Sequence, residues 1–184
     1  MDAPADTRFG RLTLTIAGLA AMVTYLDTTI LFVAFPDITR NFGESPASTL
    51  SWVLNGYTII FAALLVPMGK LADRLGHKRA FLVGFTTFTV ASLGCGLAPS
   101  VELLIVTRVL QGIGAAILIP ASLALVMAAY PREKLPQVVA IWGAIGAMSA
   151  ALGPSLGAFV VDTLSWRWAF LRNLPIGFIT VAAG

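Results

Sequence analysis

The sequence predicts an all-α membrane protein, and three observations support this fold class. The chain has 184 residues, of which 58% are hydrophobic and only 11% are charged, whereas a soluble domain carries about 25% charged residues. Its apolar residues form runs long enough to be spans, because a helix crosses the bilayer core in about 20 residues. Gly and Pro occur inside these runs, as helices in lipid tolerate.

Six candidate spans follow one another along the chain. They cover residues 12–35, 50–68, 80–97, 103–129, 138–161 and 168–184. The first is too long for the apolar region of a secretory signal, about 7–15 residues, and no A-x-A site follows it, so we expect it to be retained. The sixth has few residues after Arg172 and no closing polar flank. We therefore expect a truncated piece of a longer chain, the alternative being a marginal sixth helix.

The loops between these spans predict the orientation in the membrane. One side carries eight basic residues: Arg8, Arg11, Lys70, Arg74, Lys78, Arg79, Arg132 and Lys134. The opposite loops carry Asp37, Arg40, Glu44, Glu102, Asp162 and Arg167. Basic loops stay inside, so residues 1–11 are expected to form a cytoplasmic N-terminus. The expected partner of the chain is thus a lipid bilayer, and the net charge of +3 does not indicate a nucleic acid.

Several classes of protein find no support in the sequence. The single Cys95 lies inside an apolar run and His77 is the only histidine, so we expect neither a disulfide framework nor a metal site. The stretch GPSLG at residues 153–157 matches a nucleophile elbow, which needs a strand-turn-helix context and a histidine partner; it lies in a span instead, and we expect no enzyme. No charge ring or carbonyl filter indicates a channel.

Two opposite charges inside the spans are the strongest candidates for function. Asp27 lies fifteen residues after Leu12, or about 22 Å from the cytoplasmic face and about 8 Å from the other. Arg108 lies on the fourth span, which runs inward from about Val101, so it is about 10 Å below the outer face. The two charges are therefore expected at similar depth. Each costs about 2.5–3.5 kcal/mol at mid-membrane, which pairing or a water-filled cavity would offset.

Asp27 is poised between two opposing influences. Burial favours the protonated carboxyl, whereas a neighbouring guanidinium favours the carboxylate. A group held between them can change protonation as its access to water changes, which predicts a proton or substrate site. A purely structural ion pair is the alternative. Gln111, one turn from Arg108, is expected to hydrogen-bond in the same cavity.

The stretch GKLADRLGHKR, residues 69–79, lies between the second and third spans. We expect Gly69 and Gly76 to permit a tight reversal. Asp73 is expected to cap a helix or pair with a basic residue of a neighbouring helix. Arg74, Lys78 and Arg79 complete the charged group.

Small residues mark two helix-packing faces. On the fourth span, Gly112 and Ala116 form a small-xxx-small face that permits close packing. The fifth span carries a groove of small residues: Gly143, Gly146, Ala150, Gly153 and Gly157. Pro154 interrupts this span and is expected to kink it. Four further residues are expected either to line a cavity or to face lipid or core: Tyr25, Trp52, Asn55 and Tyr57.

Taken together and in this order, these stretches resemble the major facilitator superfamily, and within it the fourteen-helix drug:proton antiporters of the EmrB/QacA type. LDTTILFVAFPDI is similar to the family's first-helix motif, with Phe32 in place of the usual Asn. GKLADRLGHKR is similar to G-x-L-a-D-r-x-G-r-k, RVLQGIGAA to R-x-x-q-G-x-g-a-A, and SAALGPSLGA to g-x-x-x-G-P-x-x-G-G. WRWAFLRNLPIG looks like the start of the sixth helix, with Arg172 where the family is usually apolar, so that helix is expected to begin later.

This resemblance implies the N-terminal six-helix half of a transporter made of two halves, each with inverted three-helix repeats. It implies that Asp27 and Arg108 couple proton and substrate movement, with no cofactor beyond the proton gradient. Asp73 and Arg74 would latch against the second half, and Gly153 and Pro154 would line the seam between halves. A chain of this length is expected to need a missing C-terminal half or a second copy to export amphiphilic substrates from the cell. A non-transporting fragment is the alternative.

Overall fold

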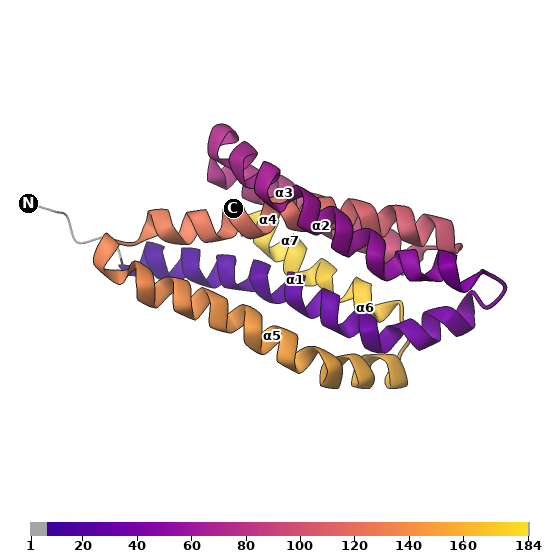
Figure 1. The fold of residues 1–184 in the computed structure, drawn as a ribbon. Coiled ribbons are helices and arrows are strands. Elements are labelled where there is room, and N and C mark those ends of the chain that lie inside the picture. Colours follow the sequence, from indigo (N-terminus) through magenta and orange to yellow (C-terminus); the bar gives the residue numbers. More distant parts are fainter. Residues whose placement is uncertain (1–6, 184) are drawn as a thin grey trace, which may run out of the picture.

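The computed structural model describes residues 7–183, and within them the chain is a bundle of long helices (Figure 1). The elements are α1 (Thr7–Asn41), α2 (Ala47–Leu75), α3 (His77–Leu97), α4 (Val101–Ala129), the 3-10 turn η1 (Arg132–Lys134), α5 (Leu135–Thr163), α6 (Trp168–Leu171) and α7 (Asn173–Ala183). By length and composition, α1 to α5 can each cross a membrane. The all-α membrane fold expected from the sequence is confirmed.

The helices are longer than the apolar runs that predicted them. The first span, expected at residues 12–35, belongs to a helix that begins at Thr7 and continues through Pro36 to Asn41. Asp37 and Arg40, expected in a loop, lie on its last turns and pair at 2.6 Å. Hydropathy marks only the part of a helix that can lie in hydrocarbon, whereas the backbone hydrogen bonds of a helix can continue beyond it.

α4 is the central helix, with α3 and α2 packed along it, while α5 packs chiefly on α1. α7 lies between α1 and α3 and contacts both (Figure 1). α2 and α5 are the least buried of the five long helices. Their exposed apolar side chains leave two outer flanks for lipid or for further protein.

A single residue joins α2 to α3. Gly76 lies between Leu75 and His77 with φ at 89°, a conformation that glycine adopts without steric cost. The predicted role of Gly76 in the reversal is therefore correct. Gly69 does not take part, because it lies inside α2, where its α-carbon faces Pro120 of α4.

Close approaches of backbone to backbone hold α3 and α2 against α4. A Cβ on Gly114 would come within 2.6 Å of the Phe88 backbone nitrogen, and one on Gly84 within 2.9 Å of the Leu118 nitrogen. A Cβ on Gly112 would lie 2.9 Å from the carbonyl oxygen of Tyr57. The packing face expected at Gly112 thus receives α2, and small residues allow these helices to touch.

The small-residue groove of α5 faces α1. A Cβ on Gly153 would overlap the side chain of Thr29, and one on Gly157 would lie 3.3 Å from the Cα of Ile30. Gly153 is therefore buried inside this bundle, not at an outer seam as expected. Pro154 lies within α5, whose helix continues past it, and its side chain is exposed.

The sixth span, expected as one helix over residues 168–184, is divided. α6 ends at Leu171, and α7 begins at Asn173. Between them, Nε of Arg172 donates to the Ala169 carbonyl at 2.9 Å. The later start that the resemblance implied for this helix agrees with the boundary at Asn173.

The close α3–α4 packing predicts a cost for any side chain at Gly114. We expect Gly114→Ala to lower the free energy of unfolding by about 1–3 kcal/mol, because a methyl group there must push two backbones apart. Denaturant-induced unfolding of the purified protein, followed by circular dichroism, measures the change.

Gly143→Ala is the matched control. Nothing lies within 4 Å of a Cβ at that position, and alanine favours the helix by up to about 1 kcal/mol. Equal stability losses for both variants would contradict the packing argument.

Candidate functional site: a buried polar network

The two charges expected at one depth are in direct contact. Nη1 of Arg108, on α4, lies 2.6 Å from Oδ2 of Asp27, on α1. Asp27 is 2% exposed and Arg108 1% exposed. Counting residues from the membrane face along each helix therefore predicted correctly that Asp27 and Arg108 lie at the same depth. In such a dry environment the electrostatic attraction is far less screened than at a surface.

Hydrogen-bond donors surround the Asp27 carboxylate. Besides Arg108 on Oδ2, its Oδ1 accepts from Nε2 of Gln111 at 2.9 Å and from Nδ2 of Asn173 at 3.0 Å. All three contacts come from N–H groups, and an ionised carboxylate is purely an acceptor. The arrangement shown is thus complementary to the charged form of Asp27.

Arg108 is fixed by contacts on several sides. Its Nε donates to the Val53 carbonyl of α2 at 3.2 Å, and its Nη1 donates to Oε1 of Gln111 at 2.6 Å. The guanidinium also lies over the Tyr57 ring, 4.2 Å from its centroid. Cation–π contacts of this kind are stronger when desolvated. The sequence placed Gln111 near this pair, and the structure agrees.

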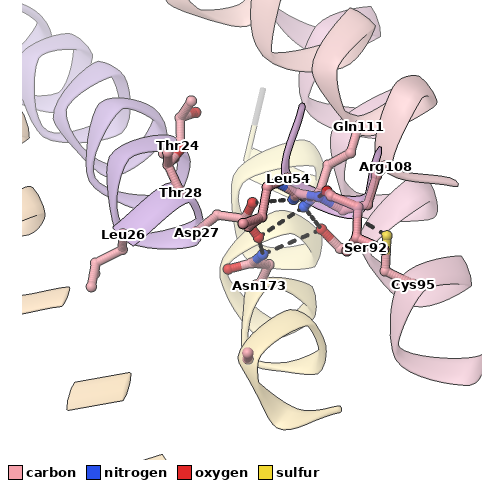
Figure 2. A network of polar contacts seen from close by, with 12 residues as sticks. Thr24, Leu26, Asp27, Thr28, Leu54, Ser92, Cys95, Arg108, Gln111 and Asn173 are labelled. Carbon is pink, nitrogen blue, oxygen red and sulfur yellow. Dashed lines mark hydrogen bonds and ion pairs between the residues drawn. The ribbon is translucent and has the colours of Figure 1, made fainter. Parts of the chain in front are cut away.

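Two members of the network were missed by the sequence analysis. Ser92 of α3 accepts from Gln111 Nε2 at 2.8 Å and from Asn173 Nδ2 at 3.2 Å. Figure 2 shows Asn173 reaching from α7 toward Asp27, with Ser92 beside it. Asn173 is a polar residue opening an apolar run, so the reasoning that singled out Asp27 could have found it. Ser92 carries no such signal, because serine in a helix often bonds its own backbone.

Cys95 lies at the edge of this network. Its Sγ is 3.2 Å from Oγ1 of Thr107 and 3.6 Å from Oε1 of Gln111. The side chain is buried, in keeping with the packing role expected for it. Among residues 7–183, no group of three His, Cys, Asp or Glu could hold a metal ion.

The charged residues of the α2–α3 connection lie elsewhere and are exposed. They are Asp73, Arg74, Lys78 and Arg79. Asp73 caps no helix, since Gly76 is the N-cap of α3, and instead its Oδ1 lies 3.8 Å from His77 Nδ1. These exposed side chains are free of the polar network.

Of the four candidate lining residues, only Tyr57 belongs to the site. It is buried against Arg108, whereas Trp52 is 52% exposed and Asn55 is also exposed. Tyr25 is partly exposed and lies against Gly146 of α5. A cavity of about 480 Å³ opens between the α1–α2 and α3–α4 loops, and none of its lining residues belongs to the network.

A buried ion pair inside a bundle of membrane-length helices is typical of membrane transporters, in which such charges mark ion and substrate paths. The chain belongs to the Major Facilitator Superfamily, which its residues 17–184 match. This is a family of transporters and not of enzymes.

Its relatives include proteins named for drug resistance. The chain is 40% identical over 171 residues to the multidrug resistance protein Stp of Mycobacterium tuberculosis, covering 92% of this chain and 32% of Stp. It is 37% identical over 172 residues to the tetracenomycin C resistance and export protein of Streptomyces glaucescens, covering 94% and 32%. The methyl viologen resistance protein SmvA of Salmonella typhimurium is 37% identical over 171 residues, covering 92% and 34%.

The chain thus spans about one third of the length of these curated relatives. Among solved structures, it superposes on a bacterial homologue of the human lysosomal transporter Spinster, in an inward-facing, unoccupied conformation. The TM-score is 0.72 at 18% identity, over 96% of this chain and 43% of that one. This likeness shows the fold alone. It supports the fold of the superfamily and carries no argument about the drug efflux branch.

The ion pair predicts strong coupling between its two members. We expect Arg108→Leu and Asp27→Leu each to lower the free energy of unfolding by about 3–5 kcal/mol, because each leaves a buried charge unpaired. The double variant should recover a large part of the summed loss. A double-mutant cycle on denaturant unfolding measures the coupling, and simple additivity of the two losses would contradict it.

Proposed function

We propose that this chain supplies the N-terminal half of a proton-coupled antiporter that exports drugs or amphiphilic metabolites. The observation that carries this proposal is the buried Asp27–Arg108 pair with its donors. Buried acids inside membrane bundles commonly serve as proton carriers. The names of the relatives, which refer to resistance and export, support the direction of transport.

In this mechanism Asp27 alternates between two states. In the arrangement that the structure shows, Arg108 and the two amides surround the buried carboxylate. When the surrounding helices separate and water reaches Asp27, a proton can bind its carboxyl group and neutralise it, which removes the main attraction to Arg108. Release of that attraction changes which arrangement of the helices is favoured, and so links proton entry to substrate exit.

Alternating access needs a second body against which this bundle can move. The exposed flanks of α2 and α5 suit such a body. The exposed group at residues 73–79 would meet it at the cytoplasmic side, which is the side that the basic loops indicate. We place the chain in the cell membrane with its N-terminus in the cytoplasm. The second body would be either a C-terminal half or a second copy of this chain.

Substitution of the carboxyl group tests the role of Asp27. In the full-length protein, we expect Asp27→Asn to abolish proton-driven export, because the amide cannot carry a proton, while the protein still inserts in the membrane. Substrate accumulation inside inverted membrane vesicles under an imposed pH gradient measures this. Methyl viologen, the compound named for the Salmonella relative, is one probe in the panel.

Asp37→Asn is the matched control, because Asp37 lies on the same helix but pairs with Arg40 near the helix end. It should export at the normal rate. Export by Asp27→Asn at that same rate would overturn the proposal.

The coding DNA distinguishes one half of a longer transporter from a chain that assembles as two copies or does not transport. We expect the reading frame to continue past the codon for Gly184, directly or after one frameshift, into further membrane spans. A genuine stop followed by unrelated sequence would instead favour two copies assembling, or a fragment that does not transport. Sequencing the locus decides between them.

A further inference from the structure

We propose that Asn173 is a positioning residue that ties helix α7 to the protonation state of Asp27. The inference rests on the proposed function for its use in transport, but the linkage itself is a property of the network. The amide side chains of Gln111 and Asn173, which come from different helices, donate to the same two acceptor atoms.

The shared acceptors are Oδ1 of Asp27 and Oγ of Ser92. Nε2 of Gln111 donates to them at 2.9 and 2.8 Å, and Nδ2 of Asn173 at 3.0 and 3.2 Å. An amide nitrogen has two hydrogens, so each nitrogen uses both. The four groups form a closed ring that links α1, α3, α4 and α7 (Figure 2).

This ring suits only an ionised Asp27. A protonated carboxyl has an O–H that needs an acceptor, yet Arg108, Gln111 and Asn173 all present N–H groups to it. One amide must turn so that its carbonyl oxygen faces Asp27. The Gln111 carbonyl oxygen is already engaged by Arg108 Nη1 at 2.6 Å. The Asn173 amide is therefore the one that turns when the proton arrives.

Turning that amide loosens the attachment of α7. Asn173 is the first residue of α7, so its two hydrogen bonds fasten the start of the helix to α1 and α3. Farther along, α7 meets α3 where Gly177 faces Thr89, while Phe178 and Ile179 are 66% and 68% exposed. The hydrogen bonds of Asn173 are therefore part of what holds the first turn of α7 against α1 and α3.

The first test measures the titration of Asp27 in the purified protein in lipid nanodiscs. The infrared signal of its protonated carboxyl is followed against pH and is assigned by its loss in Asp27→Asn. Asn173→Leu removes one donor to the ionised form at nearly constant volume. We expect the pH dependence of this signal to differ between Asn173→Leu and the unaltered protein, because the variant lacks one hydrogen bond to the carboxylate.

The second test measures hydrogen exchange of the backbone amides of α7. In the unaltered protein, protection of α7 should fall as Asp27 becomes protonated, after correction for the intrinsic effect of pH. In Asn173→Leu it should be low at every pH. Thr180→Val is the matched control, since it removes another buried hydrogen-bonding group from α7 without touching the ring, and it should behave like the unaltered protein.

Asn173→Ser keeps a small donor and should change this pH dependence less, which covers the case in which the leucine variant does not fold. An unchanged pH dependence in both Asn173 variants, or unchanged protection of α7, would overturn the linkage. Neither measurement involves transport. Normal export by Asp27→Asn would overturn the proposed function and leave this linkage standing. Unchanged behaviour of the Asn173 variants would overturn the linkage and leave the proposed function standing.

Discussion

The attraction between Asp27 and Arg108 is the constraint on which the rest of the bundle depends. Arg108 cannot lose its charge, so a dry interior can hold it only where a negative partner is fixed beside it. That requirement determines how α1 faces α4. It also explains why the neighbouring groups are polar: Gln111, Ser92 and Asn173 satisfy the remaining lone pairs of the carboxylate and of one another.

Around this pair, the helices meet with very little between them. Glycines at the α3–α4 and α2–α4 crossings let backbones touch, which brings α2 close enough for Val53 and Tyr57 to reach the guanidinium. Close packing and polar satisfaction are thus two parts of one arrangement. A bulky residue at a crossing would move the very groups that make the charge tolerable.

The fold and the depth of the ion pair could be predicted because the rise of a helix per residue is fixed. Counting from each end placed Asp27 and Arg108 at one level without any knowledge of packing. The rotation of each helix could not be predicted in this way. Where every face of a helix is apolar, no stripe tells which side faces a neighbour, so Gly153 was expected at an outer seam although it packs on α1. For the same reason, nothing in the sequence tells that Asn173 faces Asp27, although it opens an apolar run.

The one-residue connection at Gly76 has a mechanical consequence. With no slack between them, α2 and α3 cannot slide past each other along their axes, so a tilt of α2 must either rotate about that glycine or drag α3 with it. Because α3 carries Ser92, any movement of α2 that passes through Gly76 to α3 would reach a member of the polar network.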